Sequence, residues 1–141
     1  VLGGDSYDDP GVWEALGAKF GSDVYFVTHT WMQGTEGHPD MPEFVKLYTD
    51  FHGSAPDTAF VATGWDTVML FAQAAEIAGT TDGAAVAKAL EDNTFNLLTG
   101  DLDYSNAADG HYPYKAAALV ALTKGEPSFL GWRNPENPPA P

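Results

Sequence analysis

The feature that most restricts how this chain can fold is a long segment, residues 57–79, that is apolar around most of a helix's circumference. Asp57 can cap its start, and Gly79 suits the position that follows a helix. A helix that is apolar nearly all round needs cover on every side. We therefore expect it to be heavily buried through Phe60, Val61, Trp65, Val68, Met69, Phe71, Ala72, Ala75 and Ile77.

The rest of the chain supplies little sheet to cover that helix. Hydrophobic periodicity predicts further helices at about 10–20, 41–52 and 83–92, with caps at Asp9 and Asp82. It predicts a strand at 23–30, a short strand near 102–104 and another at 116–122 that continues through a turn at 124–126. This order is typical of an α/β fold whose sheet is too small for its helices.

The first residues also indicate that part of the sheet is missing. Val1 and Leu2 run directly into Gly3 and Gly4, as the last residues of a buried strand would run into a turn. A two-residue strand is too short to begin a domain, so we expect the chain to be a portion of a longer one. Either a missing N-terminal portion or a swapped partner chain should complete the fold.

The composition excludes several classes of partner. The chain has 20 acidic and 6 basic residues, a net charge of −14, which argues against nucleic acid and anionic membranes. It has no cysteine, and its four histidines follow no metal-binding spacing. We expect no metal and no cofactor.

The first candidate site is the segment Gly3-Gly4-Asp5-Ser6-Tyr7. Ligands of open α/β sheets bind beyond the carboxyl ends of strands, which is where Asp5 and Tyr7 should lie. A carboxylate there can accept charge-assisted hydrogen bonds from an ammonium group. The alternative is that Asp5 and Ser6 only satisfy backbone groups of the turn.

Five motifs follow one another along the chain: Gly3-Gly4-Asp5-Ser6-Tyr7-Asp8-Asp9-Pro10, Val24-Tyr25-Phe26-Val27-Thr28-His29, Phe44-Val45 to Tyr48, Ala59-Phe60-Val61 with Gly64-Trp65-Asp66, and Thr99-Gly100-Asp101-Leu102. In this order they resemble the second half of a type I periplasmic binding protein, in the leucine/isoleucine/valine-binding branch. The resemblance extends to about Trp132.

The resemblance implies a fold of two Rossmann-like lobes joined by three crossovers, of which only the C-terminal part is present. Residues 1–28 would belong to the second lobe, 29–97 would return to the first lobe as helices, and 98–132 would form a β-hairpin of the second lobe. The four prolines after Arg133 make 133–141 a Pro-rich tail.

The resemblance also implies a ligand site. Asp5 matches the acidic residue that holds the ligand's α-ammonium, although branched-chain binders typically have Glu there. Phe60 matches an aromatic residue that closes the pocket from the first lobe. Tyr7 and Trp65 lie near these two in sequence, and Trp31 is a further candidate for lining the cleft. The residues that bind the ligand's carboxylate fall in the absent portion.

The function implied is that of a non-enzymatic solute-binding protein of an ABC importer, which delivers an amino acid or a related small amine or aromatic solute to a membrane permease. It would be periplasmic or extracellular, with a signal peptide in the precursor and a lipid anchor at the missing N-terminus as an option. One alternative is the ligand-sensing domain of a receptor or regulator with the same fold. Another is a hydrolase that uses Asp5 and a neighbouring carboxylate.

Overall fold

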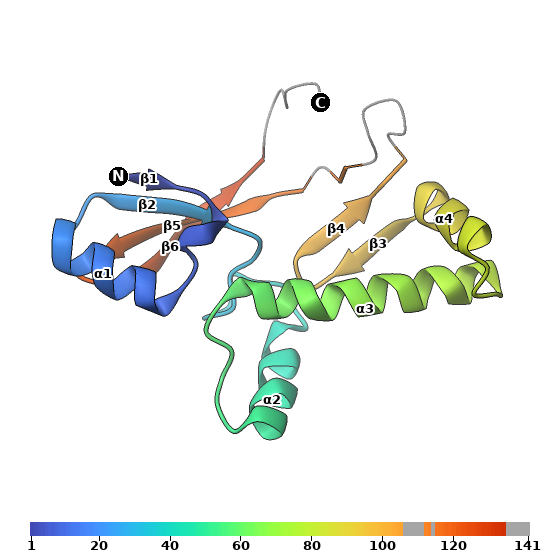
Figure 1. Cartoon of the computed structure of the whole chain (residues 1–141), viewed down its shortest axis with the longest axis horizontal. Coiled ribbons are helices and arrows are strands. Elements are labelled where there is room, and N and C mark those ends of the chain that lie inside the picture. Colours follow the sequence, from blue (N-terminus) through green and yellow to red (C-terminus); the bar gives the residue numbers. More distant parts are fainter. Residues whose placement is uncertain (106–111, 114, 135–141) are drawn as a thin grey trace.

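A computed structural model describes residues 1–105, 112–113 and 115–134, which form two packing units (Figure 1). The first, which we call the sheet unit, is a four-stranded sheet with one helix, α1 (Pro10–Phe20). The strand order is β1-β2-β5-β6; β1 and β2 are parallel, and the other two pairs are antiparallel. The strands are β1 (Leu2–Gly3), β2 (Val24–Thr28), β5 (Ala117–Thr123) and β6 (Glu126–Arg133).

Local sequence explains how α1 packs on this sheet. The Asp9 side chain accepts the backbone N–H of Val12 at 3.0 Å, as a helix cap does. Gly17 is buried where α1 meets the turn between β5 and β6, and a Cβ on Gly17 would lie 2.2 Å from the backbone nitrogen of Gly125. Only glycine permits this approach. Beneath α1 the sheet buries Val24, Phe26, Ala118, Val120 and Leu122.

The second unit, the helical unit, contains three helices and a two-stranded sheet. One buried cluster joins α3, α4 and the hairpin through Leu70, Ala74, Ala89, Phe95, Leu97 and Leu102. A second cluster places α2 against α3 through Met41, Phe44, Ala62 and Leu98. The elements are α2 (Met41–His52), α3 (Ala59–Ala78), α4 (Gly83–Asp92), β3 (Thr94–Leu97) and β4 (Gly100–Asp103).

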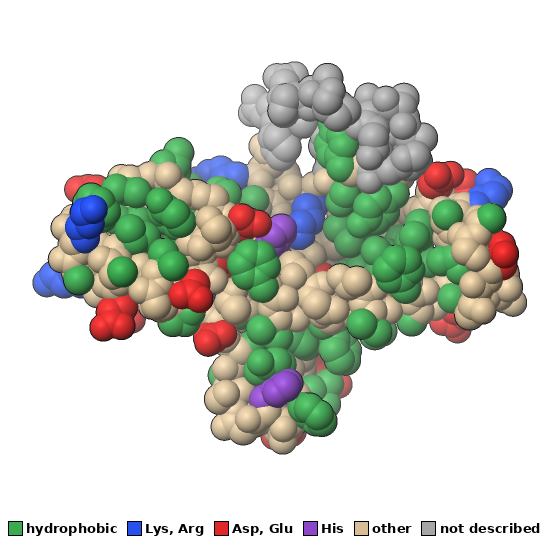
Figure 2. All heavy atoms as spheres, viewed as in Figure 1, with side chains coloured by type: hydrophobic (Ala, Val, Ile, Leu, Met, Phe, Trp, Pro, Cys, Tyr) green, Lys and Arg blue, Asp and Glu red, His purple; other side chains and the backbone are tan. Residues whose placement is uncertain are grey.

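The long helix departs from expectation in its start and its burial. It begins at Ala59, and its cap is Thr58 rather than Asp57. The prediction of heavy burial is wrong for this chain, because only one stripe is covered: Ala59, Ala62, Asp66, Leu70 and Ala74. Hydrophobic side chains therefore reach the surface of the helical unit (Figure 2). The exposed ones on α3 are Phe60, Trp65, Val68, Phe71 and Ile77.

The second half of the chain also differs from prediction. Residues 98–132 do not form one hairpin, because β4 pairs with β3 while β5 pairs with β2 and β6. The expected boundary between 97 and 98 falls inside the β3–β4 hairpin, and β3 itself was not predicted. The Pro-rich tail, from residue 135, lies outside the described residues. In the described part of the chain, none of the helices combines the length and the apolar character needed to span a bilayer.

Candidate functional site

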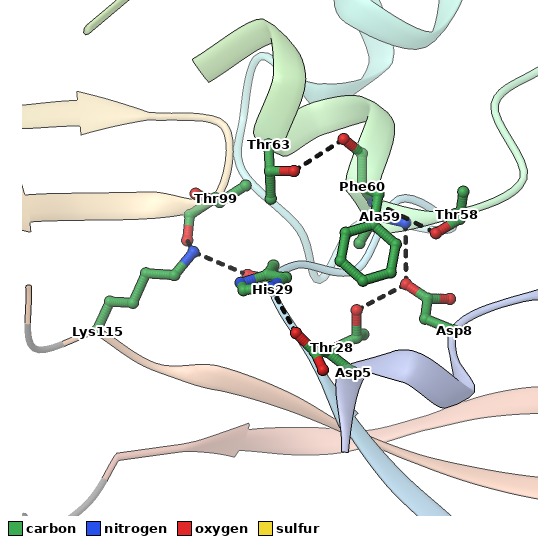
Figure 3. Close-up of polar contacts among 10 residues, drawn as sticks. All are labelled: Asp5, Asp8, Thr28, His29, Thr58, Ala59, Phe60, Thr63, Thr99 and Lys115. Atoms are coloured by element: carbon green, nitrogen blue, oxygen red, sulfur yellow. Dashed lines mark hydrogen bonds and ion pairs between the residues drawn. The ribbon is translucent and has the colours of Figure 1, made fainter. Parts of the chain in front are cut away.

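The candidate site lies where the sheet unit meets the start of α3 (Figure 3). Because β1 and β2 are parallel, their carboxyl ends meet at one edge of the sheet. A short 3-10 helix, η1 (Asp5–Tyr7), follows β1, and His29 follows β2. The first turn of α3 approaches from the helical unit and brings Phe60 to this edge.

Asp5, His29 and Phe60 form the centre of the site. The Asp5 Oδ2 lies 3.1 Å from the His29 Nε2, and the His29 ring meets the edge of the Phe60 ring at a centroid distance of 5.7 Å. The side chains of Asp5 and His29 are 52% and 35% exposed. The group therefore presents a carboxylate, an imidazole and an aromatic ring to a solvent-accessible surface.

Asp8 lies behind this group and is buried. Its Oδ2 accepts hydrogen bonds from the Thr28 hydroxyl at 2.6 Å and from the backbone N–H of Ala59 at 2.9 Å. It thus connects η1 and the end of β2 to the N-terminus of α3, where a carboxylate is favoured by the helix dipole. Burial raises the pKa of Asp8, and the hydrogen bond from Thr28 acts in the opposite direction.

Two further side chains, Asp66 and Lys115, hold the turn between β3 and β4, and Lys115 also holds the start of the segment that follows β2. The buried Asp66 of α3 accepts the backbone N–H of Leu98 at 3.0 Å and that of Thr99 at 2.8 Å. The Lys115 ammonium donates to the carbonyl oxygens of His29 at 3.4 Å and Thr99 at 3.1 Å. Desolvation lowers the pKa of Lys115 to about 8, against the opposing charge of Asp66.

The chain matches a protein-family model described as periplasmic binding protein over residues 1–127. The chain belongs to this family. A Leu/Ile/Val-binding protein homologue of Brucella suis is 34% identical over 99 residues, which are 70% of this chain and 26% of that protein. The chain therefore spans about a quarter of the curated relatives it matches.

Solved structures agree on the periplasmic-binding-protein fold. The leucine-binding protein LivK of Thermotoga maritima has a TM-score of 0.76 at 24% identity, covering 96% of this chain and 37% of that chain. LivJ of Streptococcus pneumoniae, solved with isoleucine, also has a TM-score of 0.76, at 21% identity, covering 95% and 37%. A solute-binding protein of R. palustris, solved with benzoate, has a TM-score of 0.65 at 22% identity, covering 86% and 33%. These matches confirm the predicted fold class and its partial extent.

In this family member, the five residues predicted for the site separate into two sets. Asp5 and Phe60 meet through His29. The ring of Tyr7 packs on Gly3, where an added Cβ would lie 2.2 Å from it, so its contact is with the turn. Two tryptophans lie in other contacts: Trp31 stacks on Phe129 at 5.8 Å, and Trp65 packs against Phe44 at 5.5 Å.

Sequence reasoning missed His29 and Lys115. His29 was treated as one of four scattered histidines, yet its place just after a predicted strand is the signal that could have found it. Lys115 follows a turn-rich stretch and carries no comparable signal. In the part of the chain that the structure describes, no group of three His, Asp or Glu side chains could hold a metal ion.

Proposed function

We propose that this chain is the C-terminal portion of an extracytoplasmic solute-binding protein that holds an amino acid, or a related small amine, between two lobes. The observation that carries the proposal is the grouping of Asp5, His29 and Phe60 between the sheet unit and α3. Asp5 supplies a partner for an ammonium group, and Phe60 supplies an aromatic wall from the other unit. Relatives named for leucine, isoleucine and valine support an amino-acid ligand.

The two packing units suggest how the ligand is held. In this proposal, the sheet unit belongs to the second lobe and the helical unit to the first, and the segment that follows β2 is one of the crossovers between them. Ligand contacts to both units then favour the closed form, because binding energy is gained only when the lobes approach. The absent N-terminal portion covers the exposed apolar face of α3 and contributes the residues for the ligand's carboxylate. A membrane permease of the ABC class is the proposed recipient.

Calorimetry on the full-length protein that contains this chain tests the proposal. L-leucine should bind, and 4-methylpentanoate, which has the same side chain without the amine, should bind far more weakly. Asp5→Ala should weaken L-leucine binding by roughly 2–5 kcal/mol, the effect of removing one partner of a desolvated charge pair. Asp50→Ala, at an exposed carboxylate on α2, is the matched control and should leave the affinity unchanged.

Equal affinity for L-leucine and 4-methylpentanoate would contradict the role of Asp5. Benzoate, the ligand of one structural neighbour, tests the opposite preference, for an aromatic acid without an amine. An amide and an ester of L-leucine recovered intact after long incubation would support a binding protein, whereas their hydrolysis to L-leucine would indicate a hydrolase.

A further inference from the structure

The carboxylate proposed to hold a ligand amine already has a partner within the chain. The His29 Nε2 lies 3.1 Å from the Asp5 Oδ2, in the geometry of a hydrogen bond. An imidazole N–H offers a carboxylate what an ammonium group offers it: a hydrogen bond, with a positive charge when the imidazole is protonated. A ligand ammonium group that approaches this oxygen therefore competes with the imidazole for it.

The position of His29 is fixed from both sides of its backbone. The preceding residue, Thr28, is tied to Asp8 through its hydroxyl, and the His29 carbonyl oxygen accepts from Lys115. The ring lies between Asp5 of the sheet unit and Phe60 of the helical unit (Figure 3). His29 is therefore held where it contacts both halves of the candidate site.

We propose that His29 is a specificity-determining residue that competes with the ligand's amine for Asp5, so that ligand binding weakens when the imidazole is protonated. This inference rests on the proposed function, because it concerns the same carboxylate. The neutral ring offers one hydrogen bond that an ammonium group can replace. The protonated ring offers a charge-assisted bond and also repels a cationic ligand.

Three charged groups lie around His29: the carboxylates of Asp5 on η1 and of Asp8, and the Lys115 ammonium at the His29 carbonyl oxygen. Histidine is the side chain whose charge ordinarily changes between about pH 5 and 8. A competitor that gains one proton in this range should lower ligand affinity about tenfold from pH ~7.5 to pH ~5.5.

The experiment measures L-leucine binding to the full-length protein at these two pH values. His29→Gln keeps an N–H near the Asp5 oxygen but does not titrate, so its affinity should change less than about twofold across the range. His52→Gln is the control, because His52 lies at the end of α2 against Tyr48 and Phe51. It should keep the tenfold change of the wild type.

Two results would overturn the inference. One is a pH dependence that is the same in His29→Gln as in the wild type. The other is a complete loss of binding in His29→Gln at both pH values, which would make the imidazole a ligand contact.

Imidazole NMR of the ligand-free protein provides a readout that needs no ligand. The His29 signals should move in Asp5→Asn, and unchanged signals would show that the pair is absent in solution. If the pair is present but neither L-leucine nor any other amine binds, the proposed function fails while the contact stands.

Discussion

The Asp8 carboxylate and the backbone N–H of Ala59 lie 2.9 Å apart although 51 residues separate them. The same oxygen, Oδ2, also accepts the Thr28 hydroxyl. One carboxylate oxygen thus holds the start of α3 against the end of β2. Because Phe60 follows Ala59, this contact also sets where the aromatic ring of the candidate site lies.

Substitution of Asp8 should separate the loss of an acceptor from the loss of a charge. Asp8→Ala leaves two buried donors without a partner, so it should lower the free energy of unfolding by about 2–4 kcal/mol. Asp8→Asn retains one oxygen that can accept both bonds and should stay within ~1 kcal/mol of the wild type. Urea unfolding of the three proteins measures the difference. Equal losses in the two variants would contradict this account.

The same variants test how the contribution of Asp8 to stability depends on pH. Burial raises the pKa of Asp8, so the folded state binds its proton more readily than the unfolded state does. The contribution of Asp8 to stability is therefore largest at low pH and is lost as pH rises through the raised pKa. On acidification, stability should shift in favour of the wild type relative to Asp8→Asn, and a shift the other way would count against the raised pKa.

Substitution by asparagine should be more destabilising at Asp66 than at Asp8. Its Oδ1 accepts from Leu98 and its Oδ2 from Thr99, so each oxygen has its own N–H donor. Asp66→Asn places an amide NH₂ against one of those donors and should lower the free energy of unfolding by about 1–3 kcal/mol. The contrast with Asp8→Asn in the same urea experiment is the test. If neither substitution changed the free energy of unfolding, the number of carboxylate oxygens that accept hydrogen bonds would not decide whether asparagine is tolerated.

Gly17 should tolerate no side chain. A Cβ there would lie 2.2 Å from the backbone nitrogen of Gly125, and a backbone turn cannot yield as a flexible side chain can. Gly17→Ala should therefore cost about 1–3 kcal/mol or more through overpacking. Gly64→Ala, in α3 with open space around the new Cβ, is the matched control and should stabilise by about 0.5–1 kcal/mol. Thermal unfolding followed by circular dichroism compares the two.

Lys115 should make the free energy of unfolding depend on pH in the alkaline range. Its pKa is lowered from 10.5 to about 8, so between these values the unfolded state holds the proton more tightly than the folded state. Stability should then rise with pH across this window. Lys115→Met should remove that rise, whereas Lys46→Met, at an exposed pair with Asp50, should retain it. A rise that persists in Lys115→Met would assign it to another group.

Local signals made much of the fold predictable. The Asp9 and Asp82 caps and the helix end at Gly53 follow from residue types with narrow backbone preferences, and all three are confirmed. The start of α3 was misplaced by one residue, because Asp57 and Thr58 are both capable caps. The strand β3 was missed because its four residues alternate too briefly to be told from a loop.

The candidate site was less predictable than the fold. Asp5 was named from its place after a strand end and Phe60 from the resemblance, but periodicity cannot show that a histidine 24 residues beyond Asp5 would lie between them. Asp66 accepts from backbone N–H groups and Lys115 donates to backbone carbonyl oxygens of distant segments, and neither kind of backbone group carries a sequence signal. Trp65 was chosen because it lies near Phe60 in sequence and Trp31 because it is an aromatic residue in a glycine-rich loop, and neither criterion distinguishes packing from ligand contact.

The buried stripe of α3 attaches this one helix to both packing units. Its first residue is tied to Asp8, and about two turns later Asp66 is tied to the segment after β3. A 20-residue helix is a stiff rod of ~30 Å, so it cannot bend to satisfy one attachment without moving the other. A small displacement of the Phe60 ring would therefore also move the opposite end of α3, where Ala78 packs near α4. In this way α3 can transmit a movement at the candidate site to the far end of the helical unit.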